Sequence, residues 1–339
     1  MSAELTPYEI FEAGPVHLQC GITLPEAKLA YATFGRLNAA LDNVVVYPTR
    51  YGGSHADNEF LIGPGMALDP EKYFIIVPNM LGNGVSSSPS NTPVPLAGPD
   101  FPRITQYDNV MLQERLLREV FGITKVRLAC GWSMGGQQAY HWAALFPDRV
   151  EAMACFCGQA ITAGHTYVFL EGVKHALITD PAWMQGRYKE PPWRGLTAKG
   201  RVWAGWVLSQ EWFREELWRG MGYVSVEDYL KNVWDAMYYG LDANDMLSLI
   251  ATWQACDISA NPLYNGDREA ALKAITAKSI VLPCRTDFYF PPEDNAREVA
   301  LMPNAELRVI DSVWGHYAGG GRNQPDTDMI DTALRELLA

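Results

Sequence analysis

Short, almost continuously apolar segments recur along this chain, and several of them are separated by segments with helical spacing. Apolar runs that do not alternate with polar residues are typical of strands buried on both faces, as in a parallel sheet covered by helices. These runs cover residues 43–49, 73–79, 125–130, 151–158, 279–287 and 305–312. We expect helices at residues 106–122, 135–147 and 328–339. The alternation predicts an α/β architecture with a mostly parallel, doubly wound sheet.

The alternation stops between about residues 160 and 270 and resumes after residue 278. The intervening segment is rich in helix formers and holds eight of the eleven tryptophans. Because strands return after it, we expect residues 160–270 to be a helical insertion that caps the sheet. Residues 1–159 and 271–339 would then form the core that contains the sheet. A second, independent helical domain is the alternative.

Composition disfavours several classes of function. The net charge of −12 argues against nucleic-acid binding, which needs a basic patch, and against an anionic membrane surface. No apolar run reaches the roughly 18 residues of a membrane span, and the N-terminal residues lack the basic cluster and apolar stretch of a signal peptide. Six cysteines without a CxxC pair predict neither a disulfide scaffold nor a zinc site. We therefore expect a cytoplasmic protein that needs no metal and no cofactor.

The segment GWSMG (residues 131–135) has the pattern G-x-S-x-G and lies between a predicted strand and a predicted helix. In this context the serine occupies a sharp, strained turn, where glycines avoid clashes between strand and helix. The turn makes Ser133 a candidate nucleophile and leaves the backbone N–H of Met134 at a helix N-terminus, where it can stabilise an oxyanion. We expect the second oxyanion donor to be the backbone N–H of Tyr51, in the loop after an early strand. A glycine-rich turn with an incidental serine is the alternative.

A serine nucleophile needs a base, and the base needs an acid that orients it. His316 is the only histidine beyond residue 175, and it follows a predicted strand in a loop, so it is the candidate base. Asp287 ends an apolar strand, at the edge where open α/β sheets place site residues, and it completes the chain order Ser, Asp, His. Asp311, five residues before His316, is the rival acid, with a turn cap as its other interpretation.

These motifs and longer stretches of the chain resemble the homoserine O-acetyltransferase family of α/β-hydrolase-fold proteins. The resemblance covers most of the chain, and several of its stretches are specific to that family rather than to the fold. The similar stretches are IGPGMALDPEKYFIIVPNMLG (62–82), DFPRIT (100–105), GWSMGGQQAYHWAALFPDRV (131–150), ALITDPAW (176–183), GLDANDMLSLIATWQACDIS (240–259) and DSVWGH (311–316).

The resemblance implies an α/β-hydrolase fold, with a mostly parallel doubly wound sheet and a helical lid over residues 160–270. In that family the lid is often also the dimer contact, so a homodimer is expected. The resemblance further implies ping-pong acyl transfer through an acyl-serine. It assigns the catalytic roles to the same three residues, Ser133, Asp287 and His316.

The sequence departs from the family pattern at positions expected to hold the acyl acceptor. Trp132 precedes the serine where the family has glycine, and Asn83 lies in LGNG where the family has LGGC. Lys174 takes the place of an arginine that holds the acceptor carboxylate, and a lysine lacks the bidentate fork. After His316 the chain reads YAGGG, without the usual acidic residue. We expect Trp132, Lys174 and Asn83 to line an altered substrate pocket.

An acyl-serine passes its acyl group either to water or to another alcohol, and the choice depends on the acceptor pocket rather than on the catalytic residues. Because the expected homoserine-binding positions are altered, we predict hydrolysis of short-chain esters, acetates above all. Trp132 and the tryptophan-rich lid would narrow the acyl pocket. Transfer of acetyl from acetyl-CoA to homoserine, serine or a related alcohol is the alternative. A catalytically inactive ligand-binding protein on the same fold is a more remote one.

Overall fold

The computed structural model describes residues 7–339. One sheet runs through this part of the chain in the spatial order β1-β2-β4-β3-β5-β6-β7-β8. Its parallel strands are β3 Val44–Val46, β4 Phe74–Pro78, β5 Leu128–Trp132, β6 Ala152–Phe156, β7 Lys278–Leu282 and β8 Ala305–Leu307. Each of these strands overlaps one of the six apolar runs. The prediction of a mostly parallel α/β sheet is therefore confirmed.

An antiparallel hairpin, β1 Glu9–His17 and β2 Thr23–Phe34, extends the sheet beyond β4. The apolar runs do not predict these two strands. Most residues of β1 are partly or fully exposed, and charged residues interrupt its apolar ones. Antiparallel strands at a sheet edge have one wet face and alternate in polarity, so they leave no continuous apolar run.

Helices cover both faces of the sheet. α1 Gln106–Phe121, α2 Met134–Leu145, α8 Arg268–Lys273 and α9 Pro292–Val299 contribute to the core on one face, and α10 Gln324–Leu338 packs on the other. Neighbouring residues of each parallel strand point into different cores; in β4, Ile76 packs on the α1–α2 side and Ile75 on the α10 side. Burial on both faces is the reason that these strands read as continuous apolar runs.

Local sequence signals determine where α1 begins and ends. Thr105 and Asp108 form a capping box at its N-terminus, and Gly122 ends it in the left-handed conformation with φ of 67°. These signals fix α1 close to the predicted span 106–122. None of the helices within residues 7–339 is long and apolar enough to cross a bilayer.

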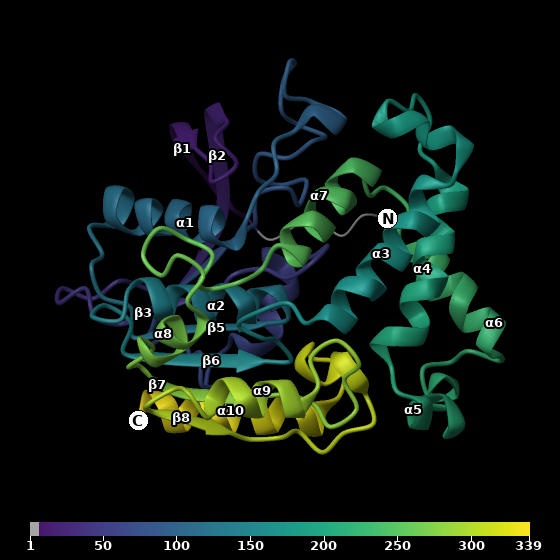
Figure 1. Ribbon diagram of the computed structural model, residues 1–339. Coiled ribbons are helices and arrows are strands. Elements are labelled where there is room, and N and C mark those ends of the chain that lie inside the picture. Colours follow the sequence, from purple (N-terminus) through teal and green to yellow (C-terminus); the bar gives the residue numbers. More distant parts are fainter. Residues whose placement is uncertain (1–6) are drawn as a thin grey trace.

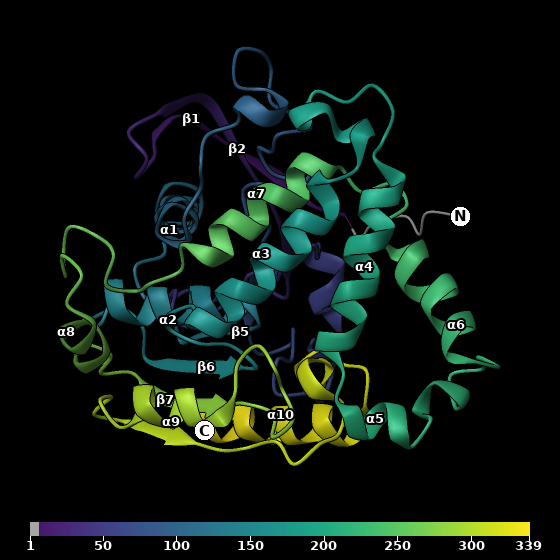
Figure 2. The same cartoon turned by 45° about the vertical axis from the view of Figure 1, so that its right-hand side comes forward.

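Between β6 and β7 the chain leaves the sheet and forms a helical cap (residues 164–254). Figures 1 and 2 show the cap at one end of the sheet, the end toward which β6 points. An isolated antiparallel bridge between Ile161 and Asp257 marks the neck of this insertion. Beyond the neck, Ile258 and Leu272 pack in the core with α1 and α2. The cap helices are α3 Gly164–Ile178, α4 Trp193–Val207, α5 Gln210–Arg214, α6 Val226–Tyr229 and α7 Ala243–Gln254.

Candidate active site

Ser133 stands in a tight turn between β5 and α2. Its backbone has φ of 58° and ψ of −126°, a conformation that a residue with a side chain rarely adopts. Strand and helix almost touch here, because a Cβ atom on Gly131 would lie 2.2 Å from the carbonyl carbon of Gly135. The side chain of Ser133 lines a cavity beneath the cap, although only 3% of the residue is exposed. The turn thus presents the hydroxyl to an enclosed space.

The structure brings the side chains of Ser133, His316 and Asp287 into one hydrogen-bonded series. His316 Nε2 lies 2.9 Å from Ser133 Oγ, and His316 Nδ1 lies 2.7 Å from Asp287 Oδ2. All three residues are buried. An ionised carboxylate can only accept hydrogen bonds, so a neutral imidazole beside it carries its ring proton on Nδ1. The other ring nitrogen, Nε2, is then free of a proton and can accept from the serine hydroxyl. Such a series can remove the hydroxyl proton of Ser133 as the oxygen attacks an electrophile.

Backbone groups hold Asp287 in this orientation. Its Oδ1 accepts from the N–H groups of Tyr289 at 2.8 Å and Phe290 at 3.3 Å, which leaves Oδ2 for His316. The hydroxyl of Thr286 accepts from the N–H of the residue before His316, at 3.1 Å. The loop after β7 therefore positions both the carboxylate of Asp287 and the loop that carries His316.

Other titratable groups of the core have different surroundings. The side chain of Asp311, the rival acid, is 85% exposed and forms an ion pair of 2.7 Å with Arg285. His141 on α2 lies 2.8 Å from the carbonyl oxygen of Gln137, and burial lowers the pKa of His141 to about 4. Burial also raises the pKa of the Cys157 thiol well above its usual range. None of these groups takes part in the series that contains Ser133.

Two backbone N–H groups are candidates for binding an oxyanion at Ser133. Met134 is the first residue of α2, so no preceding helical carbonyl accepts its N–H. Tyr51 follows β3 in a loop that lines the same cavity. In the part of the chain that the structure describes, neither N–H donates a hydrogen bond. Because unpaired buried donors are rare, two of them around Ser133 suit a negatively charged oxygen.

The cavity in front of Ser133 is small, at about 70 Å³, and mostly aromatic. Both the core and the cap contribute to its wall. The aromatic residues that line it are Tyr51, Trp132, Trp203, Trp234, Tyr238, Trp253 and Tyr317. Trp132, which we expect in the substrate pocket, is thus on the wall. Three of the cap tryptophans join it there, so the tryptophan content of the insertion partly reflects the site and not only cap packing.

The indole of Trp132 also contacts the loop that carries His316. Its Nε1–H donates to the backbone carbonyl of His316 at 3.1 Å, and the two rings lie 5.2 Å apart. A Cβ atom on either Gly319 or Gly320 would come within 2.4 Å of the indole. The large residue before the nucleophile and the glycine run after the histidine therefore depend on each other. Both features stand at positions where the sequence departs from the pattern of the family that it resembles.

Arg50, which no sequence motif marks, brings a charged group to the cavity wall. Its guanidinium lies 4.9 Å from the centre of the Trp132 ring. It also donates to Asp57 Oδ1 and to the carbonyl of Tyr51, both at 2.9 Å. The only sequence signal was its position next to Tyr51 in the expected oxyanion loop. Arg50 holds that loop against Trp132, while Asp57 balances its charge.

Lys199 on α4 is a second feature that no sequence motif marks. It is fully buried, and within residues 7–339 its Nζ has no hydrogen-bond partner. The Nζ atom lies 3.9, 4.7 and 5.1 Å from the ring centres of Tyr238, Trp203 and Tyr51, all of which line the cavity. Burial lowers the pKa of Lys199 well below its usual range. The amine therefore sits behind the aromatic wall rather than in the cavity.

Lys174 and Asn83, which we predicted to line the substrate pocket, are not among the residues that line this cavity. Helical periodicity turns Val173 of α3 inward and leaves Lys174 at the side of the helix, where its Nζ pairs with Glu171 at 3.0 Å. The amide of Asn83 donates to the carbonyl of Gly53, two residues after Tyr51, at 3.2 Å. Both predictions came from alignment to a family pattern. The surrounding contacts correct them.

Comparisons with known proteins agree with the fold. Residues 42–319 match the family described as the alpha/beta hydrolase fold. The chain is 38% identical to an ethyl acetate hydrolase from Pseudomonas veronii, over 98% of this chain and 96% of that protein. It is 31% identical to a homoserine O-acetyltransferase from Chlorobium chlorochromatii, over 99% and 98%. The crystal structure of an acetylester hydrolase from Corynebacterium glutamicum superimposes with a TM-score of 0.95, at 37% identity, over 98% of this chain and 96% of that one.

Proposed function

This chain belongs to the α/β-hydrolase fold family, and we propose that it is a carboxylic ester hydrolase that cleaves short-chain esters, acetates above all, with Ser133 as nucleophile. The observation that carries the proposal is the hydrogen-bonded series of Ser133, His316 and Asp287 at a small aromatic cavity. A serine needs such a base and orienting acid to attack an acyl carbon at neutral pH. The small cavity suits a short acyl group.

The proposed reaction has two halves. Ser133 Oγ attacks the ester carbonyl carbon while His316 Nε2 takes the hydroxyl proton, and the N–H groups of Met134 and Tyr51 stabilise the negative oxygen. The bond to the alcohol oxygen then breaks, and His316 returns its proton to the leaving alcohol. In the second half, water attacks the acyl-serine with His316 as base. The carboxylic acid leaves, and the proton returns to Ser133.

Two features support water rather than a second alcohol as the acyl acceptor. Two relatives that are 38% identical are named ethyl acetate hydrolase and probable esterase, whereas six relatives named homoserine O-acetyltransferase are 30 or 31% identical. The cavity wall is largely apolar. The guanidinium of Arg50, which lines the cavity, already pairs with Asp57. A charged amino-acid acceptor would have to give up its water for this wall, which costs free energy.

Acetyl transfer from acetyl-CoA to homoserine, serine or a related alcohol is the second candidate function. It is supported by the relatives named homoserine O-acetyltransferase, one of which matches 99% of the chain. Acylation of Ser133 is the same in both functions. The two differ only in which molecule resolves the acyl-serine.

We expect the purified protein to convert ethyl acetate into equal amounts of ethanol and acetate, because water resolves the acyl-serine. Homoserine or serine, added at up to millimolar concentration, should leave the rate of acetate release unchanged. Acetyl-CoA with homoserine should release no free thiol. Proton NMR follows the ester products, and a thiol reagent follows CoA. Formation of O-acetylhomoserine from either donor would contradict hydrolysis and support the transferase.

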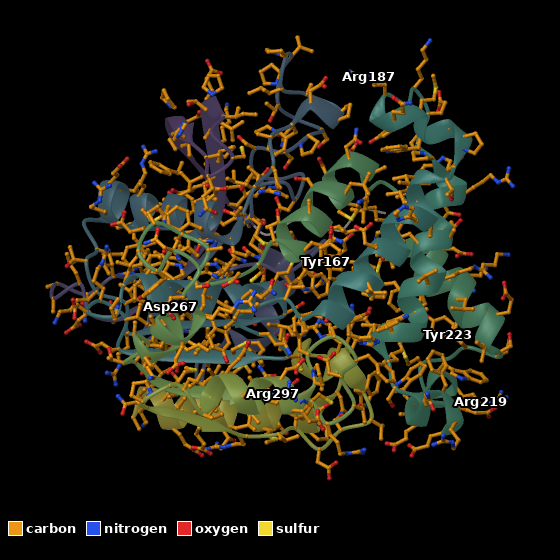
Figure 3. The ribbon with its side chains drawn as sticks, viewed as in Figure 1. Tyr167, Arg187, Arg219, Tyr223, Asp267 and Arg297 are labelled. Atoms are coloured by element: carbon orange, nitrogen blue, oxygen red, sulfur yellow. The ribbon has the colours of Figure 1, made fainter. Side chains whose placement is uncertain are left out.

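We also propose a homodimer that forms through the cap. α3 and α4 pack against each other and carry exposed apolar side chains, among them Tyr167, Val168 and Val202. Figure 3 labels Tyr167 on α3. Apolar surface on adjoining helices favours burial against a second copy.

Analytical ultracentrifugation at micromolar concentration is expected to give the mass of a dimer. Val168→Asp places a charge on the proposed contact and should shift the protein toward the monomer, because an unpaired charge is costly to bury. Val120 is also exposed but lies near the end of α1, outside the cap, so Val120→Asp is the matched control and should leave the dimer intact. A monomeric wild-type protein would rule out the contact.

A cytoplasmic location is a further proposal. The six cysteines are unpaired, and five of them are buried. Reducing compartments keep cysteines in this state, whereas exported proteins often use them in disulfides. Fractionation of the producing cells would test the location.

A further inference from the structure

A second cavity, of about 410 Å³, lies on the outer side of the active-site wall. The cap segment 221–237 and the loop after β8 form most of it, and we call it the outer groove. Its aromatic and aliphatic lining includes Tyr223, Tyr229, Val233 and Trp314. Figure 3 labels Tyr223 at the outer end of the cap. Met237 and Tyr317 line both the outer groove and the cavity at Ser133, so these two side chains form a partition between them.

The lining of the outer groove suits an apolar ligand. The ring of Tyr229 lies 5.4 Å from that of Tyr223. Asn232 is polar, but its amide already donates to the Asp228 carboxylate at 2.7 Å. Arg322 is exposed and lies 5.8 Å from the centre of the Tyr317 ring. Alkyl and aryl groups would therefore meet mostly ring faces and aliphatic side chains here.

The position of the groove relative to His316 indicates which part of an ester would reach it. In the proposed reaction His316 Nε2 protonates the leaving alcohol, so the alcohol must lie on the histidine side of Ser133. Tyr317 directly follows His316 in the chain and lines the cavity. An alcohol longer than ethanol would extend toward Tyr317 and Met237.

Of the two side chains in the partition, Tyr317 is held in place and Met237 is flexible. Trp234 is buried and stacks on the ring of Tyr317, with ring centres 6.2 Å apart and an interplanar angle of 14°. Met237 is 39% exposed and has an unbranched, flexible side chain. It follows a π-helical segment, Leu230–Asp235, an uncommon element that is frequent at functional sites. The structure thus allows Met237 to make way while Tyr317 stays in place.

We propose that the outer groove binds the alcohol part of the ester, and that it favours acetates of apolar alkyl or aryl alcohols. This inference rests on the proposed ester hydrolase function and extends it from the acyl group to the leaving group. It predicts a division of roles. The small inner cavity selects the acyl group, and the outer groove selects the alcohol.

The test compares hexyl acetate and benzyl acetate with ethyl acetate, whose alcohol is too short to pass the partition. Ala236 lines the groove and is exposed, so Ala236→Trp fills the groove without disturbing the core. We expect it to lower the kcat/KM ratio of hexyl or benzyl acetate to ethyl acetate by about tenfold, since each lost methylene contact in a pocket changes specificity on this scale. Met237→Ala should raise the same ratio. Ala270→Trp, on an exposed position of α8, is the matched control and should not change it.

Two outcomes would overturn the inference while the proposed function stands. The first is active Ala236→Trp and Met237→Ala variants that keep the wild-type ratio. The second is an Ala236→Trp variant that loses activity on ethyl hexanoate but not on hexyl acetate, which would assign the groove to the acyl chain. A wild-type protein that cleaves none of these esters would overturn the proposed function as well. The two failures are therefore distinguishable.

Discussion

Replacement of Ser133 by alanine is expected to lower kcat for ester hydrolysis by about 10⁴- to 10⁶-fold, while the protein stays folded. The hydroxyl is the proposed nucleophile, and its loss leaves only binding and oxyanion stabilisation to act on the ester. Its one side-chain hydrogen bond within residues 7–339 goes to His316, at 2.9 Å. Alanine keeps the Cβ atom and loses only that bond. Thermal unfolding should therefore change little.

The measurement uses p-nitrophenyl acetate for turnover and a fluorophosphonate probe for labelling of the nucleophile. Wild-type protein should be labelled at Ser133, and the Ser133→Ala variant should not be labelled. Ser279→Ala is the matched control, because Ser279 is also buried but stands near the start of β7, where its hydroxyl donates to Ala277. It should keep wild-type turnover. A wild-type protein that neither turns over nor accepts the label would instead be the catalytically inactive ligand-binding protein.

The parts of the fold that sequence reasoning predicted are those where burial leaves an unambiguous pattern. A strand covered on both faces has to be apolar throughout, so runs such as 43–49 and 73–79 identify β3 and β4 directly. The hairpin β1–β2 carries charged residues on its exposed face and leaves no such run. These two strands could not be predicted from the sequence, because a half-exposed strand has the composition of a loop once glycine or proline interrupts the alternation of polar and apolar residues.

Two properties of the sequence predicted residues of the candidate site: their order in the chain and their positions after predicted strands. Matching single residues to a family motif predicted the lining of the cavity less well. Ser133, Asp287 and His316 each lie on the C-terminal side of a parallel strand, and the structure places His316 within hydrogen-bonding distance of the other two. Lys174 was assigned by its place in a family motif, yet the face of α3 on which it lies depends on packing. Arg50 reaches Trp132, and Lys199 reaches Tyr51 and Tyr238, through contacts between segments far apart in sequence. No local pattern encodes such contacts.

Asp287→Asn is expected to lower kcat by about 10⁴-fold, because the amide would reverse the tautomer of His316. The N–H groups of Tyr289 and Phe290 both donate to Oδ1, so asparagine would keep its carbonyl oxygen there. Its NH₂ group would then face His316 Nδ1, at the position of Oδ2. Nδ1 would have to accept that hydrogen bond, which moves the imidazole proton to Nε2. A protonated Nε2 cannot take the proton of Ser133.

The comparison with Asp311→Asn separates this role from a general effect of removing a carboxylate. Asp311 is the rival orienting acid in the sequence, but its side chain is exposed and paired with Arg285. Exposed ion pairs contribute little to stability, so Asp311→Asn should keep wild-type kcat and wild-type unfolding temperature. Steady-state kinetics and fluorophosphonate labelling rates should both fall for Asp287→Asn alone, since both report the nucleophilicity of Ser133. If the two variants lose activity equally, or if Asp287→Asn stays within tenfold of wild type, then Asp287 does not orient the histidine. The 2.7 Å contact between them would then be structural.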